Sequence, residues 1–191
     1  MLSSAEPTLA AAMAAGVDQV AAAVRRVTRV PTIVLVDGRS GAGKSTFADL
    51  LASRVDEATV VRLDDVYPGW DGLRAGADTV RARVLAPLRR GDPGRWPEWD
   101  WDADRLSGRE RRVDPARIVI AEGAGVLTPA SARLADVTVW VDAPREARRA
   151  RALERDGETY RPHWDRWERQ EDVHVRDHRP AEIAGVVVTL P

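Results

Sequence analysis

The sequence predicts an α/β fold in which a five-stranded parallel sheet forms the middle of three layers. Five short apolar runs, rich in β-branched residues, lack strict alternation and are typical of strands covered on both faces. Helical patterns separate most of these runs, and such alternation favours a doubly wound sandwich. Four of the five runs also lead into an Asp or a Glu.

The elements follow in order along the chain. Residues 1–31 are expected to carry an amphipathic helix over residues 9–24, followed by arginines that suit a helix C-terminus. The five expected strands are Thr32–Asp37, Thr59–Asp64, Arg117–Glu122, Val137–Asp142 and Val186–Leu190. Further helices are expected over residues 44–55, 79–90, 144–156 and 164–174.

The segment 67–116 does not follow this pattern. It is rich in Pro, Gly and charged residues, contains four tryptophans, and shows one helical stretch, Thr79–Arg90. A long irregular segment in a small domain usually carries function or moves. We therefore expect an irregular, mobile insert that contributes to a binding site.

Length and composition exclude several classes of protein. The 191 residues suit one domain, 1–191, since a domain has ~150 residues. The absence of cysteine excludes disulfides, thiolate zinc sites, iron–sulfur clusters and cysteine nucleophiles. The net charge of −1 argues against a nucleic-acid or anionic-membrane binder. No apolar run approaches the ~20 residues of a membrane span, and the N-terminus is a poor signal peptide, so we expect a cytoplasmic protein.

The first expected strand runs directly into a phosphate-binding loop. Gly38–Thr46 fits the pattern G-x-x-x-x-G-K-[ST], and a helical pattern follows it, as this P-loop motif requires. Glycines let successive N–H groups point at phosphate oxygens, and the helix N-terminus adds positive potential. The residues predicted to bind the nucleotide are Gly38, Ser40, Gly41, Ala42, Gly43, Lys44, Ser45 and Thr46. Lys44, the only lysine in the chain, would reach the outer phosphates, and the Ser45 hydroxyl can bind Mg²⁺.

Two subclasses of P-loop protein fit poorly. GTP-binding proteins read guanine with N-K-x-D, and this chain has no second lysine for it. Leu106–Glu110 imitates the signature of ABC-type ATPases, but the chain is short for that fold and Ile120–Glu122 lacks the Asp expected before the Glu. Small-molecule kinases remain, with a regulatory or scaffold ATP-binding protein as the alternative.

Further motifs follow the loop in a distinctive order. They are Asp64–Tyr67 after the second strand, Pro97–Trp101 with Arg105, Glu122-Gly123 after the third strand, and Arg148, Arg151, Arg155 and Asp156 after the fourth. In this order the chain resembles the uridine kinase and phosphoribulokinase family over roughly residues 32–160. The resemblance implies a P-loop NTPase sandwich of the nucleoside kinase type, which uses ATP and Mg²⁺.

The resemblance also implies roles for individual residues. Asp64 matches the general base that takes the proton from the acceptor hydroxyl, with Asp65 as second choice, and Glu122 matches the acid that holds Mg²⁺. The residues implied to contact the acceptor are Asp65, Tyr67, Trp99, Asp100 and Arg105. Residues 145–170 match a lid, in which Arg148, Arg151 and Arg155 would face the phosphates.

The chain departs from the family where the acceptor would bind. The stretch after Trp101 is Asp102-Ala103-Asp104, without the histidine that contacts pyrimidine in uridine kinases. The acceptor is therefore expected to be a small hydroxylated molecule, a nucleoside or another sugar-containing metabolite, and homo-oligomerisation stays open. His174 and His178 have the spacing of a metal pair without a third ligand, so a lid or packing role is favoured there.

Overall fold

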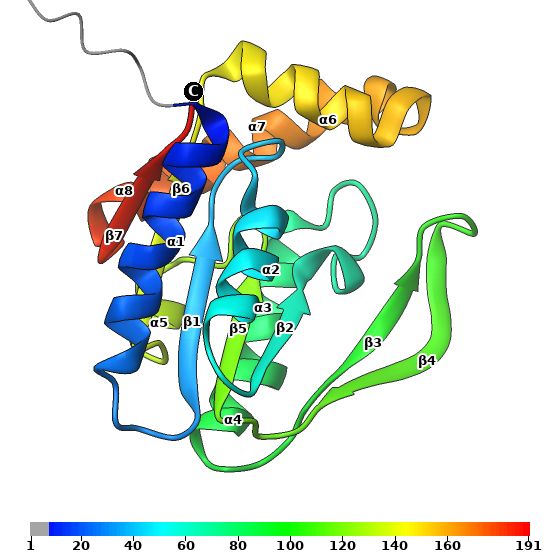
Figure 1. Ribbon diagram of the computed structural model, residues 1–191. Coiled ribbons are helices and arrows are strands. Elements are labelled where there is room, and N and C mark those ends of the chain that lie inside the picture. Colours follow the sequence, from blue (N-terminus) through cyan, green and yellow to red (C-terminus); the bar gives the residue numbers. More distant parts are fainter. Residues whose placement is uncertain (1–7) are drawn as a thin grey trace, which may run out of the picture.

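The computed structural model describes residues 8–191 and confirms the α/β sandwich (Figure 1). Five parallel strands lie in the order β2-β5-β1-β6-β7. Their bounds are β1 Thr32–Asp37, β2 Ala58–Arg62, β5 Ile118–Glu122, β6 Val137–Asp142 and β7 Val186–Thr189. The register pairs Val36 of β1 with Glu122 of β5, which in turn pairs with Arg62 of β2. The carboxyl ends of these three strands therefore meet at one edge of the sheet.

Helices cover both faces of the sheet. Along β1, Ile33 and Leu35 face one apolar core, whereas Val34 and Val36 face the other, and all four side chains are fully buried. The helices are α1 Leu9–Arg25, α2 Lys44–Arg54, α3 Leu73–Val80, α4 Ala86–Arg89, α5 Pro129–Ala132, α6 Arg145–Tyr160, α7 Trp164–His178 and α8 Pro180–Ile183. The first two cover the Val34 face, because their apolar residues, Phe47 and Leu51 among them, belong to the second core. This arrangement gives the three expected layers.

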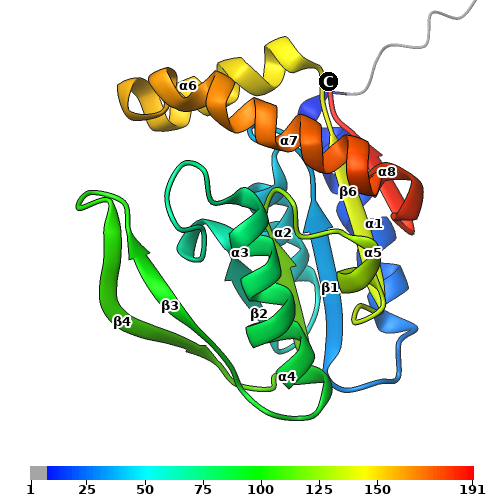
Figure 2. The same cartoon turned by 180° about the vertical axis from the view of Figure 1, so that it is seen from behind.

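The expectation of an irregular insert over 67–116 is wrong. A π-helical turn, Arg81–Leu85, joins α3 to α4, so the helix begins at Leu73, six residues earlier than expected. A two-stranded antiparallel hairpin follows, β3 Gly94–Asp100 and β4 Arg105–Val113, and extends away from the sandwich (Figures 1 and 2).

The hairpin escaped the sequence pattern because, apart from Trp96 and Val113, it buries few apolar side chains. Most of β4 is exposed, and cross-strand ion pairs replace apolar contacts. Arg95 lies 3.1 Å from Glu110, and Arg111 lies 2.7 Å from Glu98. A strand solvated on both faces has no reason to alternate apolar and polar residues.

Helices α6 and α7 cross above the carboxyl edge of the sheet (Figure 2). The turn of α6 at Gly157 has φ 55° and ψ −134°, which interrupts the helix where the sequence predicts its end. Only glycine adopts this backbone conformation readily. The helix then resumes to Tyr160, and α7 continues to His178, four residues beyond its expected end. Among residues 8–191, no helix has the length and apolar character needed to cross a membrane.

Candidate active site

A cavity of about 620 Å³ lies at the carboxyl edge of the sheet, beneath α6. The phosphate loop contributes Ser40, Gly41, Lys44 and Ser45 to its lining. A second cavity of about 630 Å³ lies between α3, α5 and α7, and apart from His174 and His178 it contains none of the residues singled out from the sequence. The first cavity is therefore the candidate active site.

The backbone of the phosphate loop depends on its glycines. Gly41 has φ 76° and Gly43 has φ 98°, and a Cβ at Gly41 would collide with the carbonyl oxygen of Arg148. Lys44 begins α2, is only 9% exposed, and its Nζ donates to the Arg39 carbonyl at 3.0 Å. Of the other predicted loop residues, Gly38, Ala42, Gly43 and Thr46 do not line the cavity. The backbone conformation thus requires glycine at positions 41 and 43, and the close approach of α6 requires it at position 41 as well.

Ser45 and Glu122 lie together at the floor of the cavity. The Ser45 hydroxyl donates to Glu122 Oε1 at 3.0 Å, and Arg62 Nε lies 3.7 Å from the same oxygen. Burial raises the pKa of Glu122, while the Lys44 ammonium favours its charged form. A hydroxyl and a carboxylate in contact form the hard-oxygen donor set that Mg²⁺ prefers, so these residues fit the metal role.

Asp64 projects from a 3₁₀ turn, Leu63–Asp65, at the end of β2. Its side chain is open to the cavity, yet protein surrounds it on most sides. This loss of solvation raises the pKa of Asp64, whereas the charges of Lys44 and Arg155 lower it. Asp65 does not line the cavity. The structure therefore brings the first aspartate of the pair, and not the second, to the phosphate loop.

Aromatic rings form one wall of the cavity. The rings in the lining are Tyr67, Trp70, Trp101, Tyr160 and Trp167. Trp70 is central among them, with ring centroids 4.9 Å from Trp101 and 5.5 Å from Tyr160. Tyr67 is fully packed, and its hydroxyl donates to the Ala124 carbonyl at 2.7 Å. Planar or C–H-rich faces of a ligand would pack against such a wall.

Trp99, Asp100 and Arg105, which the motif predicted, do not line this cavity. Asp100 Oδ1 accepts the backbone N–H groups of Asp102 and Ala103, so this carboxylate shapes the hairpin turn. The turn brings Trp101 inward instead, where its Nε1 donates to the Asp64 carbonyl at 2.9 Å. Sequence reasoning missed Trp70, Trp101 and Asp102 as lining residues.

The three predicted lid arginines have different partners. Arg148 is 4% exposed and donates to the carbonyls of Ala143 and Ser40 at 3.2 and 3.3 Å. Arg151 Nε donates to the Gly41 carbonyl at 3.0 Å. Of the three, only Arg155 lines the cavity, where it forms two hydrogen bonds to Asp156, at 2.8 and 2.6 Å. The first two arginines thus hold the backbone of the phosphate loop from outside.

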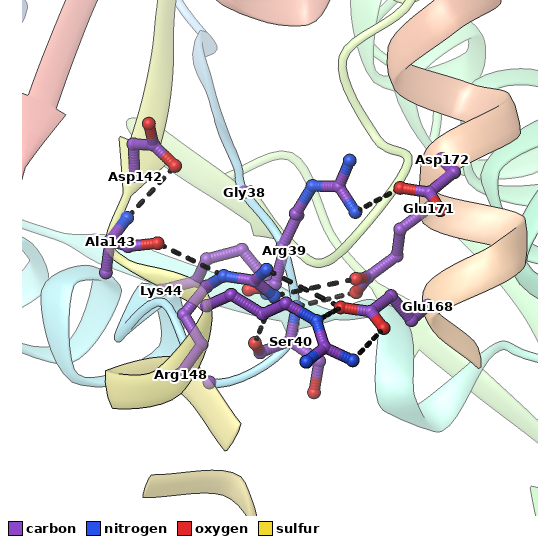
Figure 3. A network of polar contacts seen from close by, with 12 residues as sticks. Gly38, Arg39, Ser40, Lys44, Asp142, Ala143, Arg148, Glu168, Glu171 and Asp172 are labelled. Carbon is purple, nitrogen blue, oxygen red and sulfur yellow. Dashed lines mark hydrogen bonds and ion pairs between the residues drawn. The ribbon is translucent and has the colours of Figure 1, made fainter. Parts of the chain in front are cut away.

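Helix α7 holds the same loop from another side (Figure 3). Glu171 Oε1 accepts the N–H of Ser40 at 2.6 Å, and Arg39 pairs with Asp172 at 2.6 Å. One turn further along α7, His174 Nε2 lies 3.0 Å from Asp37 Oδ2. His174 therefore pairs with a carboxylate and does not form a metal site together with His178.

Sequence reasoning missed Glu171, and it missed Asp37 as the partner of His174. The spacing of Glu171 and His174 relative to Trp164 and Trp167 could have indicated that both are buried. Residues 164, 167, 171 and 174 fall on one helical stripe, and all four are buried. Two ionisable residues on a buried stripe require partners.

Comparison with known proteins agrees with this geometry. No protein-family model matches the chain. A curated uridine kinase of Lactobacillus helveticus (strain DPC 4571) is 30% identical over 144 residues, which cover 66% of this chain and 68% of that protein. The chain belongs to the uridine kinase-like family of P-loop kinases.

A second curated relative supports this family, and one solved structure supports the fold. The uridine kinase of Latilactobacillus sakei subsp. sakei (strain 23K) is 27% identical over 146 residues, 69% of either chain. The structure of a possible uridine kinase from Bacillus stearothermophilus superposes with a TM-score of 0.69 at 18% identity, over 92% of this chain and 98% of that chain. The latter likeness concerns the fold alone.

Proposed function

We propose that this uridine kinase-like protein transfers the γ-phosphoryl group of Mg·ATP to a hydroxyl of a small molecule. One observation carries the proposal: three separate segments line a single cavity, namely the start of α2 with Lys44 and Ser45, the turn after β2 with Asp64, and the end of β5 with Glu122. Phosphoryl transfer requires a phosphate-binding loop, a metal site and a base within one cavity.

The phosphate loop would bind the triphosphate. Its amides and the N-terminus of α2 favour anions, and Lys44 adds a compact charge that reaches the outer phosphates. Ser45 and Glu122 would hold Mg²⁺, which when bound neutralises charge on the β- and γ-phosphate oxygens.

Asp64 would accept the proton of the acceptor hydroxyl. It follows a sheet strand and lines the same cavity as the loop, so an acceptor bound in that cavity would be within reach of both. Arg155, the lid arginine in the lining, is the candidate for contact with the transferring group. Arg148 and Arg151 would act by holding the loop, since their guanidinium groups already bond to its carbonyls.

The aromatic wall would hold the acceptor. Trp70, Trp101 and Trp167 line the cavity, and a nucleoside base or the C–H face of a sugar would pack against this apolar surface. The relatives are named uridine kinases, and the acceptor proposed here is a nucleoside or another sugar-containing metabolite. We assign acceptor contact to these rings in preference to Trp99, Asp100 and Arg105, which lie outside the lining.

Replacing the base tests the proposal. Asp64→Asn keeps the shape of the side chain and removes its basicity, so ATP binding persists while acceptor-dependent ADP release falls by ~10²-fold or more. Asp65→Asn is the matched control and changes release much less. A regulatory or scaffold ATP-binding protein would show no acceptor-dependent ADP release from a metabolite panel in the unmodified protein, and that result would refute the kinase proposal.

A further inference from the structure

Glu171 places a buried carboxylate against the phosphate loop. Its side chain is 2% exposed, and Oε1 bonds to the N–H of Ser40 at 2.6 Å. Its Oε2 has no hydrogen-bond partner among residues 8–191, and Arg148 Nη1 lies 3.9 Å from it. Backbone amides of such a loop are the groups that bind phosphate. The loop therefore has an internal anion on one of its amides (Figure 3).

Cations surround this carboxylate from two elements. Lys44 and Arg39 belong to the phosphate loop and Arg148 to α6, and each favours the charged form of Glu171. Arg39 is shared with Asp172. The other titratable groups that face this region are Tyr67, Tyr160 of α6, and two residues of α7, Glu168 and His174. Glu168 is bonded to Arg145, and His174 to Asp37, so neither replaces Glu171 on the loop.

The same surroundings control the proton affinity of Glu171. Burial raises its pKa to about 6, although Lys44, the Ser40 amide and Arg148 all stabilise the carboxylate. At neutral pH the side chain is then mostly ionised in the nucleotide-free protein. A polyphosphate in the loop would bring several negative charges beside Lys44. The Lys44 ammonium would then interact with the phosphates as well as with Glu171, and the carboxylate of Glu171 would be less stabilised.

We propose that Glu171 is a positioning residue of the nucleotide site, which holds the Ser40 amide as a carboxylate in the empty loop and takes up one proton when a polyphosphate binds. This inference rests on the function proposed above. The proton comes from the buffer and adds to Oε2, which gives a neutral carboxylic acid. Its carbonyl oxygen still accepts the Ser40 N–H, so the loop keeps its support while the charge repulsion disappears.

The linkage has a definite sign. Nucleotide binding raises the pKa of Glu171 from its value of about 6, so binding consumes a proton wherever the pH lies between the two values. Over that range the dissociation constant of the nucleotide increases with pH, by up to about tenfold per pH unit for one linked proton. A carboxylate that stayed ionised in both states would give no such slope.

Calorimetry with a nonhydrolysable Mg·ATP analogue tests the coupling. Titrations at about pH 7.5 in buffers of different ionisation enthalpy give the number of protons taken up, and a value approaching one is expected. Glu171→Gln keeps a carbonyl acceptor for the Ser40 N–H but cannot titrate. Its uptake falls to near zero, and at about pH 8 it binds the analogue up to about a hundredfold more tightly than the unmodified protein.

Glu168→Gln is the matched control, because Glu168 lies one turn away on α7 and the Arg145 guanidinium lowers its pKa. This variant keeps the uptake of the unmodified protein. Analogue binding without proton uptake, or uptake that persists in Glu171→Gln, overturns the inference and leaves the proposed function standing. Failure of the unmodified protein to bind the analogue at all refutes the proposed function and this inference with it.

Discussion

Replacing Asp37 by Asn tests whether this buried carboxylate organises the backbone around the active site. Asp37 is completely buried at the end of β1, and its Oδ1 accepts the N–H groups of Gly38 and Gly125 at 2.6 and 3.0 Å. Its Oδ2 accepts the N–H of Leu127 at 2.8 Å and lies 3.0 Å from His174 Nε2. One side chain thus connects the phosphate loop, the segment after β5 and α7.

The size of the effect follows from these bonds. An asparagine has one acceptor oxygen, so in either orientation of the amide at least one buried backbone N–H faces an NH₂ group. A buried donor without a partner costs about 1–3 kcal/mol, and the remaining bonds lose the strengthening that charge provides. We therefore expect Asp37→Asn to lower the free energy of unfolding by about 2–4 kcal/mol.

Urea unfolding followed by tryptophan fluorescence measures this change, provided that the slope with denaturant is unchanged. Asp142→Asn is the control, because Asp142 is the exposed acid at the end of β6 and accepts one N–H, from Ala143 at 3.0 Å. A change of about 0.5 kcal/mol or less is expected there. If Asp37→Asn stays within about 1 kcal/mol of the unmodified protein, the carboxylate does not organise this backbone.

The other predictions concern ligand binding. Lys44→Ala raises the ATP dissociation constant at least about tenfold in calorimetry and leaves the unfolding midpoint nearly unchanged, since its ammonium faces the cavity; unchanged affinity would contradict its role. Trp101→Ala raises the acceptor KM and leaves ATP affinity intact in steady-state assays, because the ring lies on the acceptor wall; a selective loss of ATP binding would contradict this placement. Residues 148–168 gain hydrogen-exchange protection with a nonhydrolysable ATP analogue, and protection confined to residues 38–46 would contradict a lid.

The sequence was most informative where local geometry determines the structure. The strands Thr32–Asp37 and Val137–Asp142 match the structure residue for residue, because fully buried parallel strands read as continuous apolar runs. The phosphate loop was equally clear, since its glycines serve the conformation of their own backbone. Asp64 and Glu122 were singled out by the resemblance to the family's motifs, and the structure brings both to the lining of the cavity.

The sequence was least informative where tertiary packing determines which of several neighbouring side chains faces the cavity. The hairpin register shifts between Pro97 and Trp99, and this irregularity helps determine which tryptophan of the motif faces the cavity. From the sequence alone, Arg148 and Arg151 could bind either a ligand or the backbone of the loop. In the structure α6 packs so that both arginines donate to carbonyls of the loop. The hydrogen-bond partner of Glu171, the Ser40 amide, lies 131 residues away in sequence, beyond the reach of any local pattern.

The hairpin of β3 and β4 has a consequence for how this protein could acquire new substrates. It reaches the candidate active site through its tip, where Trp101 bonds to the backbone of Asp64, while most of its residues are exposed or half-buried. The phosphate loop, the Ser45–Glu122 pair and Asp64 all lie on other segments. Grafting a different tip onto the same two strands would therefore change which molecule is recognised without disturbing the groups that handle phosphate, and the hairpin is a natural module for evolution and for engineering.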